Sequence, residues 1–335
     1  MGILDWIYIL NASKQKKKFF KDGLGQLEKL SDYAVDQPSD IDVNFGAKEV
    51  DSDGIGYEEG EFASPEASKL PTESKTAYVL RVTPPDGTSV RGIVVLMAAW
   101  GDKGYTFRRD QYAIPLAKQG YTSLLLMLPF YAKRRPSYQE SYYLVSVHDL
   151  VLFFNANISE GSSLVCFARK QFPGTPVGVA GVSFGGGMAT GSAIVAGGEL
   201  ALAEMMGGPG PNTMTVGGLR GTVDWAAMER DLGPKAQEKV HDLFVGYSLM
   251  GSVRERTDLY KTNEQLAAVG AAFLHDKIIT PQLNEHMLTA LQFLAGKSSV
   301  MYLPGSHVFG FTQGKTFVNL ILRSFELAEE LKKGQ

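Results

Sequence analysis

The feature that most constrains this chain is an apolar run that leads directly into the pattern Gly-x-Ser-x-Gly. Residues 177–181 predict a short buried strand, and Ser183 follows between Gly181 and Gly185. The small residues over 185–196 predict a helix. A serine on a sharp strand-to-helix turn needs neighbours without side chains, because the backbone must fold tightly beneath the exposed hydroxyl. Chance alone gives about 0.3 such patterns in a chain of this composition, so the motif needs support from the elements around it.

Strand-like and helix-like segments alternate on both sides of the motif. Strands are expected over 76–82, 90–97, 121–127, 177–181, near 202–206, and over 267–274 and 299–303; helices are expected over 108–120, 142–172, 185–196, 281–294 and 314–332. The turn sequence Pro84-Pro85-Asp86-Gly87 predicts that 76–82 and 90–97 pair as a hairpin. The alternation favours a mostly parallel sheet with helices on both faces. A Gly-x-Ser-x-Gly turn in such a sheet is typical of the α/β-hydrolase fold.

Composition divides the chain into an N-terminal extension, a core and an insertion. Residues 1–75 are expected to form a helix followed by an acidic surface arm, because 31–60 is acidic and poor in apolar residues. The hydrolase core is expected over 76–206 and 267–335. A helical lid or insertion is expected over 207–266, after the sixth strand.

The N-terminal segment combines an apolar stretch with a basic cluster. Apolar residues over 3–10 precede five lysines and two phenylalanines: Lys14, Lys16, Lys17, Lys18, Lys21, Phe19 and Phe20. Such a segment is either a surface helix whose apolar stripe packs on the domain or an amphipathic anchor on a membrane. A transit peptide is a third interpretation, but the segment has no arginine and includes Asp5 and Asp22.

A serine hydroxyl becomes nucleophilic at neutral pH when a histidine takes its proton and a carboxylate orients that histidine. In an α/β-hydrolase these partners follow the serine in the order acid, histidine, on loops after strands. Asp276 follows the expected strand 267–274, and His307 follows 299–303. Asp224, after the preceding strand, is the alternative acid. The remaining histidines do not follow the final strand: His148, His241, His275 and His286.

The developing oxyanion needs two backbone N–H donors. One is expected from Phe184, the residue after the nucleophile, and the other from the loop after the third strand. That loop reads Ala98-Ala99-Trp100-Gly101-Asp102, which places the amide of Trp100 as the second donor.

Two basic groups lie in loops that are expected to surround Ser183. They contribute four candidate substrate-binding residues: Arg108, Arg109, Arg134 and Arg135. A guanidinium there binds a phosphate or another anionic head group through paired hydrogen bonds. The alternative is that these side chains face solvent or form structural ion pairs with Asp102, Asp110 or Glu140.

Overall charge and cysteine content limit the partners. A net charge of −3 and a pI near 6.0 give no global attraction to nucleic acid, so no nucleic-acid partner is expected. We also expect no cofactor and no metal. The single cysteine, Cys166, is predicted to be a buried structural thiol. We expect an intracellular protein, cytoplasmic by default, with mitochondrial or peripheral membrane association as alternatives.

Several motifs resemble the α/β-hydrolase-domain-containing protein eighteen family. They are residues 18–23, 61–65, 100–102 with Arg108 and Arg109, 129–136, the turn at Ser183, and 305–307. This resemblance implies a serine hydrolase with Ser183, Asp276 and His307 as its triad. The expected reaction is hydrolysis of an acyl ester, with a lipid or phospholipid as the expected substrate class and membrane contact through the N-terminal segment. The alternative is a hydrolase fold that binds ligands or partners with little turnover.

Overall fold

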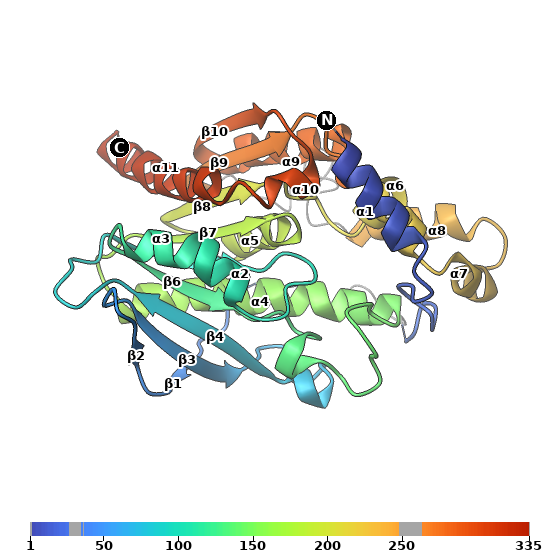
Figure 1. Ribbon diagram of the computed structural model, residues 1–335, viewed down its shortest axis with the longest axis horizontal. Coiled ribbons are helices and arrows are strands. Elements are labelled where there is room, and N and C mark those ends of the chain that lie inside the picture. The colour runs from blue at the N-terminus through green and yellow to red at the C-terminus, as the bar shows by residue number, and fades with distance from the viewer. Residues whose placement is uncertain (1, 27–34, 36, 248–262, 335) are drawn as a thin grey trace.

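The computed structural model describes residues 2–26, 35, 37–247 and 263–334. One large sheet runs through the molecule and helices lie on both of its faces (Figure 1). Its strands are β1 (Asn44–Phe45), β2 (Glu49–Val50), β3 (Gly56–Ala63), β4 (Thr76–Thr83), β5 (Gly92–Met97), β6 (Tyr121–Leu126), β7 (Val177–Val182), β8 (Leu200–Met205), β9 (Asn263–Phe273) and β10 (Ala295–Leu303).

The strand order is β1-β3-β4-β6-β5-β7-β8-β9-β10, and β2 pairs with β3. Strands β6, β5, β7, β8, β9 and β10 are mutually parallel, whereas β3 and β4 are antiparallel to their neighbours. The predicted mostly parallel sheet is therefore confirmed. The carboxyl ends of the parallel strands meet at one edge, where the loops that carry functional groups come together.

The central strands consist mostly of apolar residues because helices cover both of their faces; Thr122 and Ser123 in β6 and Glu204 in β8 are buried polar exceptions. Every residue of β5, β6, β7 and β8 is buried. Helices α4 (Val147–Gln171), α5 (Phe184–Ala196) and α9 (Pro281–Leu294) contribute to the core on one face, and α3 (Ile114–Ala117) and α11 (Gly314–Lys333) to the core on the other. Successive side chains of a strand point to opposite faces, so Val179 enters the first core and Val182 the second.

Helix α4 is long and apolar enough to cross a membrane by length and composition, but 94% of its most apolar window is buried inside the protein. This burial is typical of the core helix of a folded domain. Cys166 on α4 is only partly buried, which differs from the fully buried thiol that the sequence predicts.

The predicted hairpin between the strands at 76–82 and 90–97 is wrong. Strand β6 lies between β4 and β5, pairing antiparallel with β4 and parallel with β5. Burial explains the outcome, since β5 is buried on both faces and needs a central place, whereas β4 alternates between buried and half-buried residues. The turn sequence after β4 begins a crossover rather than a hairpin.

Part of the expected acidic arm belongs to the sheet. Residues 56–63 form β3, which pairs with β4 along its whole length. Glu59 and Glu61 are exposed and alternate with the buried Gly60 and Phe62. Glu58 lies on the same face as Phe62, where it forms an ion pair with Arg81 at 2.7 Å. These charges hide the strand from an analysis of composition. The prediction of an irregular arm over 31–60 is therefore wrong for residues 56–60. Residues 31–34 and 36 lie outside the described residues.

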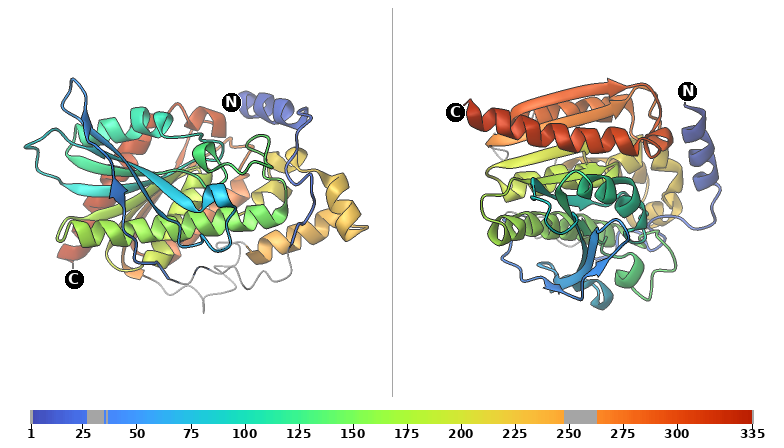
Figure 2. Two further views of the ribbon diagram at one scale, coloured as in Figure 1. Left: turned by 90° about the horizontal axis from the view of Figure 1, so that it is seen from below. Right: turned by 60° about the vertical axis from the view of Figure 1, so that its left-hand side comes forward.

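The helical insertion follows β8, the sixth strand when counted from β3. It contains α6 (Thr213–Val216), the short helix η5 (Gly218–Thr222), α7 (Trp225–Leu232) and α8 (Ala236–Tyr247). Residues 248–262 lie outside the described residues, and β9 already begins at Asn263. Helix α1 (Ile3–Ser13) packs against η5 and α10 (His307–Gly310). Figure 2 shows this N-terminal helix on the outside of the molecule.

Candidate active site

The turn between β7 and α5 presents Ser183 in a strained backbone conformation. Ser183 has φ 58° and ψ −127°, which a residue with a side chain rarely adopts. A Cβ on Gly181 would overlap the carbonyl of Gly185, and a Cβ on Gly185 would lie 2.7 Å from the carbonyl oxygen of Met97. Both glycines of the motif are therefore required by close backbone packing. The result places the hydroxyl of Ser183 at the carboxyl end of β7.

Three side chains from distant segments form a continuous hydrogen-bonded chain. Ser183 Oγ lies 2.8 Å from His307 Nε2, and His307 Nδ1 lies 2.8 Å from Asp276 Oδ2. His307 follows β10 and Asp276 follows β9, so parallel pairing of these strands brings the two loops together. With Nδ1–H donating to the carboxylate, Nε2 is left to accept the serine proton.

The carboxylate of Asp276 is held in place by its own loop. Asp276 is fully buried, and its Oδ1 accepts hydrogen bonds from the amides of Ile278 and Ile279 at 2.9 and 2.8 Å. Its other oxygen is thereby directed at His307. Asp224, the alternative acid, instead caps α7 by accepting a hydrogen bond from the amide of Ala227 at 3.1 Å.

A buried carboxylate from the N-terminal helix joins the loops of the acid and the histidine. Asp5 on α1 accepts hydrogen bonds from the amides of Lys277, His307 and Val308, at 2.9, 3.0 and 2.8 Å. Asp5 and His307 are separated by 302 positions in the chain. Local sequence reasoning did not identify Asp5, because an aspartate in the first turn of a surface helix is an ordinary stabilising residue.

The loop after β5 lies beside Ser183, where the second oxyanion donor is expected. The indole of Trp100 packs edge-on against the ring of Phe184, with 5.2 Å between the ring centroids, and both residues line the pocket at Ser183. Phe184 is the first residue of α5, so its amide has no acceptor within the helix. The structure therefore places both expected donor residues next to the serine.

A family model described as "Alpha/beta hydrolase domain containing 18" matches residues 14–266. The chain belongs to this family. The match includes Ser183, whereas Asp276 and His307 lie beyond its end.

Solved esterases share the fold. An acetyl xylan esterase from Paenibacillus sp. R4 is 14% identical, with a TM-score of 0.55, and the alignment covers 95% of this chain and 93% of that one. A cold-adapted esterase from an Arctic intertidal metagenomic library is 12% identical with a TM-score of 0.53, covering 84% and 97%. Acetyl xylan esterase 1 from Thermoanaerobacterium sp. JW/SL YS485 is also 12% identical with a TM-score of 0.53, covering 93% and 98%. The fold is that of an α/β-hydrolase, and the family membership supports a hydrolase.

Ser183 opens into a narrow apolar pocket. The pocket has a volume of about 40 Å³ and is lined by Trp100, Phe154, Phe184, Met188, Gly208, Gly210, Thr213, Leu219, Ile278 and Ile279 besides the serine. Its walls come from the loop after β5, from α4 and α5, from the insertion, and from the loop that carries Asp276. Such a lining suits an apolar group next to the reacting carbonyl.

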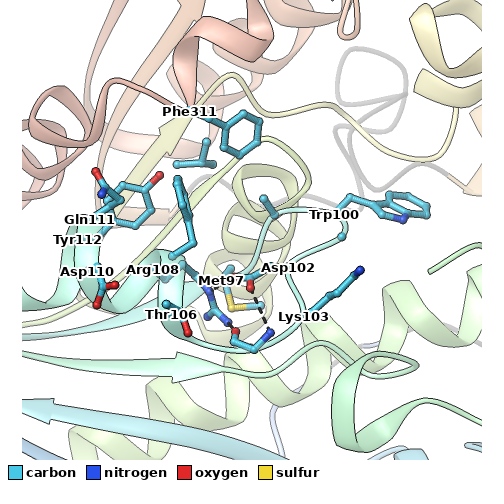
Figure 3. A pocket seen from close by; sticks show the side chains of 15 residues that line it. Met97, Trp100, Asp102, Lys103, Thr106, Arg108, Asp110, Gln111, Tyr112 and Phe311 are labelled. Carbon is cyan, nitrogen blue, oxygen red and sulfur yellow. Dashed lines mark hydrogen bonds and ion pairs between the residues drawn. The ribbon is translucent and has the colours of Figure 1, made fainter. Parts of the chain in front are cut away.

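A second, larger pocket of about 770 Å³ adjoins the first and shares Trp100 with it. Figure 3 shows its lining side chains, among them Asp102, Arg108 and Phe311. The ring of Phe311 lies 5.8 Å from that of His307, centroid to centroid, so this pocket reaches the histidine side of the site. The loop that contains Trp100 contributes to the lining of both pockets.

Arg108 lines the larger pocket, but acceptors of the protein hold its guanidinium. Its buried guanidinium donates to Asp102 Oδ2 at 2.7 Å and to the carbonyls of Leu96 and Gly104 at 2.6 and 2.9 Å. These acceptors from the protein engage all three of its nitrogens. The expectation that Arg108 binds substrate is corrected to a structural role, one that keeps the loop after β5 in position.

Arg134 is likewise structural, which corrects a second expectation. It is fully buried and forms a two-pronged ion pair with Glu160, at 2.7 and 2.5 Å. It also donates to the carbonyls of Met127 and Ser74, each at 2.8 Å. No part of its guanidinium is exposed, so a ligand cannot reach it.

The remaining two arginines differ in setting. Arg109 is 39% exposed in its side chain and pairs with Asp110 at 2.7 Å, in a surface pocket that does not include Ser183. Arg135 is exposed and stays a candidate for contact with an anionic group. The ion pairs with Asp102 and Asp110 are those that the sequence offered as the structural alternative.

Proposed function

We propose that this protein hydrolyses acyl esters through Ser183, His307 and Asp276. His307 Nε2 takes the proton of Ser183 as Oγ attacks the acyl carbon, and the carbonyl electrons move onto the oxygen to form a tetrahedral oxyanion. The amides of Phe184 and Trp100 stabilise that charge. The imidazolium then gives its proton to the departing alcohol as the ester bond breaks.

Water completes the cycle. His307 takes a proton from a water molecule, which attacks the acyl-enzyme, and the second oxyanion collapses to release the carboxylic acid and regenerate Ser183. Throughout, Asp276 keeps the histidine in the tautomer that accepts at Nε2 and stabilises its positive charge. The observation that carries the proposal is the pair of 2.8 Å contacts that join Ser183, His307 and Asp276.

The proposed substrate class is a lipid or phospholipid ester. The apolar lining of the pocket at Ser183 supports an aliphatic acyl group, because burial of each methylene group favours binding by roughly 0.8 kcal/mol. Arg135, which is exposed beyond β6, supports contact with an anionic head group.

A fluorophosphonate probe tests the nucleophile directly, because it phosphonylates only an activated serine. The wild-type protein is expected to label at Ser183, and the Ser183→Ala and His307→Ala variants are expected not to label. Ser89→Ala, in the exposed connection between β4 and β5, removes the same hydroxyl away from the site and is expected to label normally. Wild-type protein that does not label, or a Ser183→Ala variant that labels equally, would exclude the triad.

The rival is a hydrolase fold that binds ligands with little turnover, and the small volume of the pocket at Ser183 favours it. Turnover of p-nitrophenyl esters of increasing acyl length separates the two. Hydrolysis that is lost in both Ser183→Ala and His307→Ala supports the enzyme. Probe labelling without measurable turnover of any ester supports the binding protein.

A further inference from the structure

Helix α1 exposes nearly all of its apolar side chains. Six of its eleven residues are large, apolar and between 47% and 69% exposed: Ile3, Leu4, Trp6, Ile7, Tyr8 and Leu10. Exposing such a contiguous set to water is unfavourable, so an apolar patch of this kind marks an interaction surface. The helix packs on the domain, as one interpretation of the sequence expects, but among the described residues only Ile9 of its apolar stripe takes part in that packing.

The side of α1 that faces the domain already makes contacts through Asp5 and Ile9. A rotation of the helix that buried the exposed side chains would break these contacts. Asp5 and Ile9 lie one turn apart on this side. Asp5 accepts the three amide hydrogen bonds from the acid and histidine loops, and Ile9 packs with a small cluster that includes Ile278 and Ile279. Lys18 also ties the C-terminal end of the helix to the insertion, because its ammonium donates hydrogen bonds to the carbonyls of Ser13 and Gly221, each at 2.6 Å.

A basic segment follows the apolar helix directly. Lys14, Lys16, Lys17 and Lys21 are exposed. Lys17 pairs with Glu140 at 3.0 Å, whereas Lys14 and Lys16 have no ion-pair partner within the part of the chain that the structure describes. Exposed lysines beside an apolar helix that carries Trp6 and Tyr8 match an anionic bilayer, because the cations meet lipid head groups and the rings occupy the interface.

We propose that α1 docks this protein on an anionic lipid bilayer, with its exposed apolar side chains inserted among the lipids and Lys14 and Lys16 against the head groups. A second copy of the chain is a less suitable occupant. A contact between the apolar sides of two α1 helices offers no anionic group to Lys14 and Lys16, because the only carboxylate of the helix, Asp5, is buried against the domain.

Docking through α1 places the candidate active site beside the lipid surface. Ile9 and Leu219 both pack against the buried cluster of Ile278, Ile279 and Leu283. Ile278, Ile279 and Leu219 also line the pocket at Ser183. Figures 1 and 2 show α1 at the outer edge of the molecule, next to the insertion and the loops at the end of β10. This orientation supports the proposed lipid substrate, but bilayer binding itself does not depend on catalysis.

Co-sedimentation with vesicles tests the proposal, using the full chain with Ser183→Ala so that binding is measured without turnover. Phosphatidylcholine vesicles with phosphatidylserine are expected to bind this protein, and pure phosphatidylcholine vesicles to bind it more weakly. Adding Trp6→Ser with Ile7→Ser is expected to weaken binding by about tenfold or more on both kinds of vesicle. Adding Lys14→Gln with Lys16→Gln is expected to weaken binding by about tenfold on the anionic vesicles only.

A matched control removes two exposed aromatic rings elsewhere on the surface. Phe293 on α9 and Tyr302 on β10 are 41% and 51% exposed, and Phe293→Ser with Tyr302→Ser is expected to bind as the parent does. Equal loss in this control, or no binding by the parent, would overturn the proposal. A dimer that Trp6→Ser with Ile7→Ser dissociates in the absence of lipid would assign the helix to a second copy instead. Vesicle binding without esterase activity would leave docking supported and refute the proposed function alone.

Discussion

Replacing Glu204 with glutamine is expected to stabilise this protein at alkaline pH and to change its stability little at about pH 5. Glu204 lies in β8 and is buried beneath the turn that carries Ser183, between Gly181 on β7 and Gly270 on β9. Its Oε1 accepts a hydrogen bond from the amide of Gly207, and its Oε2 has no partner among the described residues. Burial raises the pKa of Glu204 from 4.5 to about 8, partly offset by the hydrogen bond from Gly207.

The direction of the effect follows from these two pKa values. The unfolded chain releases the Glu204 proton near pH 4.5, whereas the folded protein holds it until about pH 8. The stability associated with neutral Glu204 is therefore complete below about pH 4.5 and is lost as the pH rises to about 8. This interval corresponds to roughly 5 kcal/mol in the free energy of unfolding, of which roughly 3 kcal/mol is already lost at about pH 7. Glutamine stays neutral and keeps the acceptor for Gly207, so its variant avoids the loss.

Urea unfolding of both proteins between about pH 5 and pH 9 measures this difference. The variant is expected to gain several kcal/mol over the wild type across that range, with little difference at the acid end. Glu229→Gln, an exposed residue on α7, is the matched control and is expected to give a flat difference. Two parallel stability curves for Glu204→Gln and the wild type would refute the reasoning, because they would mean that Glu204 titrates alike in both states.

Three further substitutions test the site and its supports. Asp276→Asn is expected to lower kcat for a soluble ester by roughly 10⁴-fold, because the amide favours the wrong histidine tautomer; activity within tenfold of wild type would contradict this role. Asp5→Asn leaves one acceptor oxygen for the amides of Lys277, His307 and Val308. We expect kcat to fall about tenfold or more at nearly constant KM, and the free energy of unfolding to fall by about 1–3 kcal/mol. Asp22→Asn, an exposed control, should change neither kcat nor stability. Arg134→Ala is expected to lower the free energy of unfolding by roughly 3–5 kcal/mol, because it leaves the buried carboxylate of Glu160 without its partner. Arg135→Ala should unfold like wild type in the same denaturation assay. Equal effects of the two substitutions would argue against a role of the buried ion pair in stability.

Local patterns in the sequence predicted much of the chain's architecture. The small and apolar residues around Ser183 require a buried strand, a tight turn and a helix, and the structure has β7 and α5 in those places. The helix over 281–294 has the predicted bounds, and Thr280 and Pro281 are strong local signals for its start. The order of Ser183, Asp276 and His307 at the ends of successive strands also indicated which side chains to compare.

Only the tertiary structure decided which segments meet. Strand β4 pairs with β6, and Arg134 pairs with Glu160, although each pair is separated by more than twenty positions in the chain. Asp5 contacts the loop of His307 across 302 positions. A basic or acidic residue has the same local pattern whether it faces water or a buried partner from another element. The sequence by itself therefore determined the local conformation around Ser183, because sterics and hydrophobic periodicity act over a few residues. Long-range burial determined what surrounds it, because that depends on which surfaces the whole chain brings together.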